Sequence, residues 1–371
     1  MALKTEEMVL NMGPQHPSTH GVLRLEVVLE GELIVDVMPH IGYLHRCFEK
    51  HCEAMTYPQI IPYTDRMDYL ASMYNNFGYV IAVEKLLDLK VPERVEYIRV
   101  IMGELQRIAS HLVALGTYGV DIGAFTPFLY CFRDREKILD LFEMTCGARL
   151  LYNYMWVGGV SHDLHPDFLR LTQDFIDYFR PKIVELNNLL SFNKIFIERT
   201  ANVGVLPADT AINYGITGPN LRGSGVKFDL RKDDPYSIYD RFEFEIPIGH
   251  GEKGTTGDSW DRYFVRVQEM EQSLNIIQQA IKQIPEGDVF EAIPKRIKPP
   301  KGNVYARVEN PKGELGYFII SDGSLNPFRV KVRAPSFVNM EVFGELCKGH
   351  LVADVIAVLG SIDIVLGEID R

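Results

Sequence analysis

The sequence predicts an α+β protein: a central helical bundle lies between an N-terminal β module and a C-terminal α+β module. Three observations predict it. The middle of the chain carries long stretches of apolar residues at helical spacing, and a pair of short apolar runs around a turn stands near each end. We place the three parts at residues 1–60, 61–285 and 286–371.

The N-terminal part is predicted to form a β-hairpin. Two apolar runs, residues 22–28 and 33–37, flank a turn at Gly31 and Glu32. The preceding residues 13–21, GPQHPSTHG, are rich in glycine and proline, which is typical of a loop.

The middle part is predicted to be helical. Three series of apolar residues recur every three or four positions, over residues 98–115, 168–190 and 264–284. Further helices are expected near residues 67–87 and 133–150. Residues from about 201 to 261 are rich in glycine and aspartate and predict an irregular insertion of loops with short strands.

The C-terminal part begins with a basic, proline-rich connector, IPKRIKPPKGN. Residues 303–308 and 315–321 predict a hairpin around Pro311, Lys312 and Gly313. One final helix is expected over about residues 339–359.

Composition excludes several classes of protein. The chain of 371 residues has 39 Lys+Arg and 50 Asp+Glu, a formal net charge of −11, which argues against a nucleic-acid-binding protein. No stretch reaches the roughly 18 apolar residues of a membrane span, and the N-terminus lacks a signal-peptide core, so we expect an intracellular protein. Five cysteines without a CxxC pair favour neither a disulfide framework nor a self-contained metal site.

Several polar residues stand where chemistry is possible. His16 and His20 lie in the first loop, Tyr69 opens a helical stretch, and Asp121 ends another. Each has a structural alternative: a polar surface loop for the histidines, a core or interface position for the tyrosine, a turn or cap for the aspartate. Residues 44–52, LHRCFEKHC, hold possible ligands, but Cys47 and Cys52 are five apart, which is not a usual metal-ligand spacing.

Nine ordered segments together resemble a known family: GPQHPSTHGVLRL, GYLHRCFEK, PYTDRMDYLASM, RVIMGELQRIASHL, DIGAFTPFLYCFRDRE, GPNLRGSGVKFDLRK, YDRFEFEIPIG, SDGSLNPFRVKVRAPSF and DIVLGEIDR. They resemble the D-subunit family of complex I, the NADH:quinone oxidoreductase, from about residue 8 to residue 371. This family is similar to the large subunits of nickel–iron hydrogenases without the metal centre. The resemblance implies a quinone cavity where those enzymes hold metal, and no metal ligands in this chain.

The resemblance also assigns roles to residues. His20 and Tyr69 match the two ligands of the quinone head group, and Asp121 matches the carboxylate that partners the histidine. Arg46 matches an arginine close to the partner's iron–sulfur cluster, and Thr117 a polar position lining the cavity.

One position departs from the family pattern. Many members carry a histidine directly after the GGV segment, near the cluster. This chain has Ser161 there, with His162 one residue later, and we assign His162 no role. A histidine beside a cluster tunes its potential and couples it to protons, and this chain carries Ser161 in its place.

The implied setting is the peripheral arm of a proton-pumping complex, on the cytoplasmic face of the inner membrane. Quinone is the substrate, and the chain binds no cofactor of its own. A 4Fe-4S cluster in the B subunit of the complex would deliver electrons, and the C and I subunits and the membrane-embedded H subunit would be further partners. Charge changes at Asp121 and any coupled acid would signal to the pump.

Three alternatives remain beside this interpretation. One is the equivalent subunit of a ferredoxin- or F420-linked relative, and another is a non-catalytic scaffold. A metal-bearing hydrogenase large subunit is disfavoured because its thiolate set is incomplete: no cysteine follows Cys347.

Overall fold

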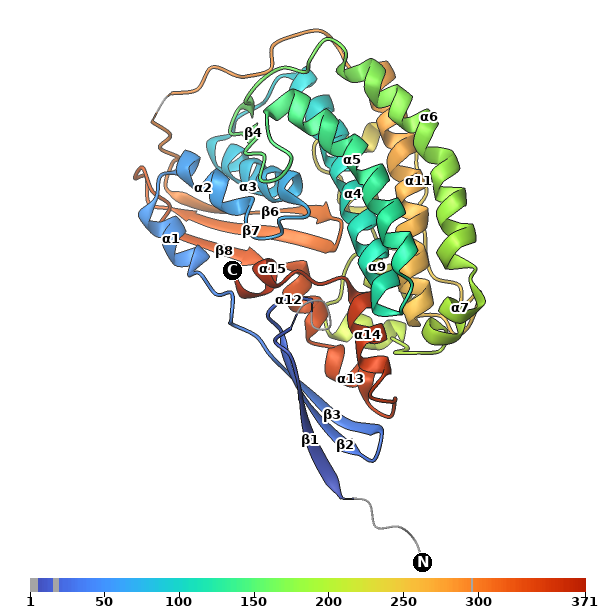
Figure 1. Cartoon of the computed structure of the whole chain (residues 1–371). Coiled ribbons are helices and arrows are strands. Elements are labelled where there is room, and N and C mark those ends of the chain that lie inside the picture. The colour runs from blue at the N-terminus through green and yellow to red at the C-terminus, as the bar shows by residue number, and fades with distance from the viewer. Residues whose placement is uncertain (1–5, 16–19, 295) are drawn as a thin grey trace, which may run out of the picture.

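The computed structural model describes residues 6–15, 20–294 and 296–371 (Figure 1). It confirms the mixed helical and strand class. One three-stranded sheet projects from a helical body near the N-terminus, and a second three-stranded sheet lies within that body (Figure 1).

The projecting sheet contains the predicted hairpin. Its antiparallel strands, in spatial order, are β1 (Glu7–Met12), β2 (Arg24–Glu30) and β3 (Leu33–His40). Leu25, Val27 and Leu29 alternate along β2 and are buried, which places one face of the strand against the body. Strand β1 was not predicted, and it forms the outer edge of the sheet.

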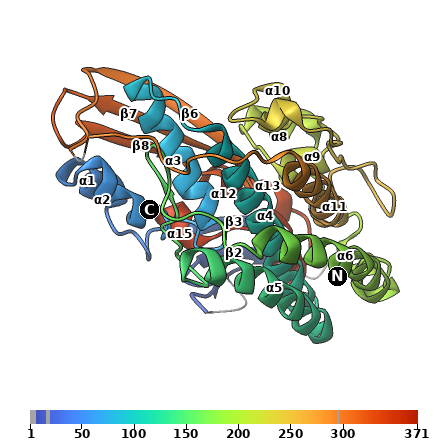
Figure 2. The same cartoon turned by 90° about the horizontal axis from the view of Figure 1, so that it is seen from above.

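The predicted bundle is confirmed in the four long helices, which lie side by side (Figure 2). These are α4 (Glu93–Asp121), α5 (Phe125–Cys146), α6 (Phe168–Leu186) and α11 (Ser259–Gln283). Helix α6 continues as a π-helix over Asn187–Ser191. Helix α4 is buried on nearly all sides from residue 97 to residue 119 because α5, α11 and α14 pack around it.

Helix α5 differs from its predicted bounds. It begins eight residues early because Pro127 lies in its first turn, where proline is tolerated, and it ends at Gly147, whose φ is +73°.

The second sheet is antiparallel, with the order β6 (Gly302–Asn310), β7 (Gly313–Ser321) and β8 (Arg329–Arg333). The predicted hairpin is therefore confirmed, and β8 is an addition. Helix α3 (Ser72–Leu87) packs across this sheet, and the turn at residues 310–313 is buried in the body.

The prediction of a single closing helix over residues 339–359 was wrong. Three short helices occupy the region: α12 (Pro335–Met340), α13 (Phe343–Cys347) and α14 (Asp354–Ile362), followed by α15 (Leu366–Asp370). The break has a physical cause. Gly349 adopts φ +77°, and its N–H donates to the carbonyl of Ile34 on β3, so this backbone pairs with the projecting sheet.

The insertion at residues 201–261 also differs from expectation, because it contains short helices where short strands were expected. They are α8 (Ala208–Asn213), α9 (Pro219–Gly223), α10 (Leu230–Asp233) and the 3-10 turn Tyr239–Arg241. The remaining elements are α1 (Phe48–Ala54), α2 (Tyr57–Thr64), α7 (Lys194–Thr200), β4 (Met155–Trp156) and β5 (Gly159–Val160).

In the described part of the chain, two apolar clusters form the interior. The larger joins the bundle helices to the second sheet, and the smaller joins β2 and β3 to the insertion and to α13–α15. Both clusters draw on more than one of the three predicted parts, and the division at residues 60 and 285 stays a prediction.

Candidate functional site

The end of α4 carries the first half of the candidate site. His20 Nε2 lies 2.8 Å from Asp121 Oδ2, and the two side chains are 14% and 3% exposed. His20 follows the undescribed residues 16–19, so the prediction for His16 lies outside the described part of the chain. The structure thus brings together two of the residues that the sequence singled out.

The environment of His20 favours its protonated form. Burial disfavours the imidazolium, but the hydrogen bond and charge of Asp121, together with the charge of Asp363, outweigh it and raise the pKa of His20. Asp363 ends α14 in the left-handed conformation. A histidine held this way is a proton donor with a fixed ring orientation.

Thr117 lies one helical turn before Asp121. Its hydroxyl donates to the backbone carbonyl of Val113 at 2.8 Å, and the side chain is half-buried. The threonine therefore shares the end of α4 with the ion pair.

Tyr69 carries the second half of the candidate site, on the turn between α2 and α3. Its side chain is 38% exposed. Burial raises the pKa of Tyr69, the charge of Asp68 adds to the rise, and the charges of Lys312 and Arg46 oppose it. Among the described residues, no hydrogen bond or ion pair joins Tyr69 to His20.

Buried polar side chains fix this turn. Gln106 on α4 donates to the carbonyl of Leu70 at 2.6 Å, and Asn75 on α3 donates to the carbonyl of Asp68 at 2.8 Å. The backbone around Tyr69 is thereby held by two helices, which gives the tyrosine a defined position.

Arg46 is anchored beside the same turn. Its Nη2 donates to the carbonyl of Arg66 at 2.6 Å, and its backbone N–H donates to the carbonyl of Arg371. The loop before it is shaped by Asp370, whose carboxylate accepts from the backbone of Gly42 and Leu44, both at 2.7 Å.

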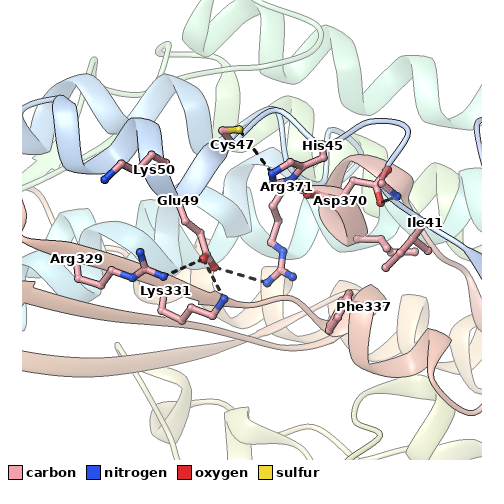
Figure 3. A pocket seen from close by; sticks show the side chains of 12 residues that line it. Ile41, His45, Cys47, Glu49, Lys50, Arg329, Lys331, Phe337, Asp370 and Arg371 are labelled. Atoms are coloured by element: carbon pink, nitrogen blue, oxygen red, sulfur yellow. Dashed lines mark hydrogen bonds and ion pairs between the residues drawn. The ribbon is translucent and has the colours of Figure 1, made fainter.

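A pocket of about 400 Å³ opens next to this loop (Figure 3). Its wall is strongly charged. Glu49 from α1 accepts from Lys331 of β8 at 2.9 Å, while Arg329 and Arg371 lie 3.9 and 3.7 Å from it. Cys47 faces His45, with 3.6 Å between Sγ and Nε2 (Figure 3).

The cysteines do not form a metal centre in the described structure. Cys47 is exposed, whereas Cys52, Cys131 and Cys347 are buried. Burial raises the pKa of the Cys52 thiol to about 12. Over the described residues, no three histidine, cysteine or acidic side chains gather where a metal ion could bind.

The departing position Ser161 follows the hairpin of β4 and β5. His162 Nδ1 lies 3.1 Å from the Ser161 hydroxyl oxygen, and that pair is exposed.

Within the described ranges, no helix has both the length and the apolar character needed to cross a bilayer.

Sequence reasoning missed a cluster of buried charged residues next to the turn that carries Tyr69. Lys312 and the acids Asp68, Asp363 and Glu368 are buried together, with Lys312 Nζ 3.2 Å from Asp68 Oδ2. The only sequence signal was a Pro-Lys-Gly turn, and such a turn is ordinarily exposed to solvent.

Comparisons with known proteins show the family to which the chain belongs. Residues 121–296 and 288–371 match the family described as respiratory-chain NADH dehydrogenase, 49 Kd subunit. The NADH-quinone oxidoreductase D subunit of Chlorobium luteolum is 58% identical over 100% of this chain and 94% of its own length. The D subunits of Chlorobaculum tepidum and Pelodictyon phaeoclathratiforme are also 58% identical, over 100% of this chain and 93% of theirs. The chain therefore belongs to the D-subunit family of complex I, the NADH-quinone oxidoreductase.

Proposed function

We propose that this chain forms the quinone-reduction site of its complex, together with a cluster-bearing partner, and couples electron transfer to proton translocation. The observation that carries the proposal is the pair of His20 and Asp121, whose side chains are 14% and 3% exposed and lie 2.8 Å apart at the end of α4. A histidine whose pKa is raised by a carboxylate is suited to protonate a reduced carbonyl oxygen.

The chemistry explains the residue types. Reduction of a quinone takes two electrons and two protons, and each electron adds negative charge to a carbonyl oxygen. His20 at one oxygen and Tyr69 at the other would stabilise that charge and supply the protons. His20 is the readier donor, because the unperturbed pKa values of histidine and tyrosine are about 6.5 and about 10.

The neighbouring residues have supporting roles in this proposal. Asp121 orients the imidazole and stabilises its charged form. Thr117 lines the cavity, and Arg46 places positive charge beside the partner's cluster, which supplies the electrons. Once His20 has given up its proton, Asp121 loses its counter-charge, and that change is the signal toward the proton pump.

The wider setting belongs to the same proposal. The chain would sit at the cytoplasmic face of the inner membrane, against the B, C and I subunits of the peripheral arm and the membrane-embedded H subunit. The exposed apolar residues Phe125 and Leu129, just beyond Asp121, support a partner at this end of the bundle.

The proposal is tested by Tyr69→Phe, which removes one hydroxyl. The measurement is quinone-reductase turnover in membranes, with the amount of assembled complex quantified alongside. Tyr63→Phe is the matched control, because Tyr63 lies six residues earlier and is 43% exposed. We expect Tyr69→Phe to lose turnover with normal assembly. Normal turnover and quinone affinity in Tyr69→Phe would refute the site and favour a scaffold role.

A further inference from the structure

The turn between β6 and β7 is buried, which is unusual for a hairpin. Asn310, Lys312 and Gly313 are all buried, and Lys312 has an exposed fraction of 0%. Gly218 packs directly against the backbone of Gly313, so the turn is enclosed by the insertion as well as by the helices. An ammonium group in such a place is stable only with charged or polar partners.

Lys312 has partners from three separate elements. Its Nζ lies 3.2 Å from Asp68 Oδ2, before α3, and 3.2 Å from the hydroxyl of Ser110 on α4. Asp363 Oδ2, after α14, lies 3.9 Å away. The charge of Glu368 also acts on Lys312.

Asp68 and Asp363 each connect Lys312 to a different half of the proposed site. Asp68 directly precedes Tyr69, and its Oδ1 accepts from the backbone of Leu70 at 3.1 Å. Asp363 is one of the charges that act on His20. Lys312 is therefore linked to the tyrosine turn through Asp68 and to the histidine through the charge of Asp363. The side chains of Tyr69 and His20 have no direct hydrogen bond in the described structure.

We propose that Lys312 is a positioning residue, a buried charge hub that joins the Tyr69 turn and the His20–Asp121 pair into one electrostatic unit. A charge change at either half then alters proton affinity at the other. This inference rests on the proposed quinone site and adds to it a residue that, in the described structure, has no hydrogen bond or ion pair to either assigned head-group ligand.

The charged groups around Lys312 explain how its charge acts on both halves of the site. Three acids act on Lys312: Asp68, Asp363 and Glu368. The guanidinium of Arg266 lies 3.7 Å from Asp363, and the charge of Lys312 acts on Tyr69. Burial opposes the charge of Lys312, but Asp363, Asp68 and Glu368 together raise its pKa, so the ammonium form persists. Burial raises the pKa of Glu368 to about 7, so this group accepts or releases a proton near neutrality.

Removal of the ammonium has a defined consequence. Asp68 and Asp363 are left without this cation, and Asp363 keeps only the guanidinium of Arg266, 3.7 Å away. The negative charge of Asp363, which raises the pKa of His20, is then less compensated. The pH above which His20 loses its proton therefore moves to a higher value.

The experiment compares Lys312→Met with Lys301→Met in the assembled complex. Lys301 is the matched control because it is exposed and precedes β6 of the same hairpin. The kcat, the KM for a short-chain quinone analogue and the pH profile are measured, with NADH–ferricyanide activity as a check on the upstream part of the enzyme. We expect at least a tenfold fall in kcat for Lys312→Met and an alkaline limb at higher pH, and neither change in Lys301→Met.

A structural role alone would not move the pH limb. Lys312→Arg keeps the positive charge. The alkaline limb of its pH profile should therefore stay near that of the parent, even if its kcat is lower. If Lys312→Met does not assemble, the double variant Lys312→Met/Asp68→Asn removes the unpaired charge and is measured in the same way. If the alkaline limb of the pH profile is unchanged in whichever of these variants assembles, the proposal that Lys312 joins the two halves is overturned. If Lys312→Met has the turnover and pH profile of the parent while Tyr69→Phe has lost turnover, the role of Lys312 is refuted and the quinone site stands. If both variants have normal turnover, the proposed quinone site is refuted as well.

Discussion

His20 and Asp121 are separated by 101 residues in the sequence and by 2.8 Å in the structure. The contact forms because His20, which lies shortly before β2, reaches the end of α4, the helix on which α14 also packs. A carboxylate in this position holds the imidazole ring and favours its charged form.

Asp121→Asn should therefore lower the pKa of His20. The folded-state pKa is raised in the parent, so the protonated form persists to higher pH there than in the variant. We expect quinone-reductase activity to fall by roughly tenfold or more, and its alkaline limb to move to lower pH. The measurement is the pH profile of turnover in membranes with equal amounts of assembled complex. A profile that matches the parent would remove Asp121 from the site.

The candidate site could be predicted from the sequence only through resemblance. Spacing offered no reason to place His20 near Asp121, because contacts between distant segments depend on the whole fold. The buried position of Lys312 could not be predicted for another reason. A turn with proline and glycine is ordinarily exposed to solvent. This turn is buried because Gly218, from a different segment, packs against it.

Asp65 offers a test of how burial fixes the turn that carries Tyr69. Its Oδ2 accepts from the backbone of Asn153 at 2.9 Å, its Oδ1 has no hydrogen-bond partner in the described structure, and burial raises its pKa to about 7. The folded form thus binds this proton more tightly than the unfolded chain. The contribution of this bound proton to the free energy of unfolding is present at low pH and is lost as the pH rises through about 7.

Asp65→Asn should remove this pH dependence, because the amide stays neutral and keeps an acceptor for Asn153. One pKa unit corresponds to about 1.4 kcal/mol of stability. We expect the Tm of the parent to fall more steeply between pH 5 and pH 8 than that of the variant. Thermal denaturation of the purified chain at both pH values makes the comparison, and parallel changes in the two proteins would contradict it.

The bundle was predictable because its helices are long and their apolar spacing is regular. The C-terminal region was not, since the segment at Gly349 pairs with β3 and this pairing overrides the local preference for helix. Strand β1 has little burial to signal it: its residues are exposed or half-buried along its whole length.

The ion pair of Arg99 and Glu84 should be a large contributor to stability. Arg99 Nη1 and Nη2 donate to the two carboxylate oxygens at 2.9 and 2.7 Å, and Glu84 also accepts from the backbone of Gly158. Arg99→Met leaves a buried carboxylate without its cation, which costs about 3–5 kcal/mol in the free energy of unfolding. The double variant Arg99→Met/Glu84→Gln should recover part of that loss. Urea denaturation of the three proteins tests both statements, and equal stability of the parent and Arg99→Met would contradict them.

The buried turn at Lys312 depends on a glycine in the insertion. Gly218 has φ +71°, and a Cβ there would lie 2.4 Å from the Cα of Gly313. Gly323 is the matched control, because its φ is +92° but no atom lies within 4 Å of the place that a Cβ would take. Both alanine variants carry the cost of a left-handed backbone, about 1–2 kcal/mol.

Gly218→Ala should lose more stability than Gly323→Ala, by about 1–3 kcal/mol for the added overpacking. The clash is with backbone, so no side chain can rotate to relieve it. The turn must shift, and Lys312 shifts with it, so quinone-reductase turnover should fall in Gly218→Ala and stay normal in Gly323→Ala. Urea denaturation and turnover are measured on both variants. Equal losses of stability would show that strain in φ is the whole effect and that the turn tolerates displacement.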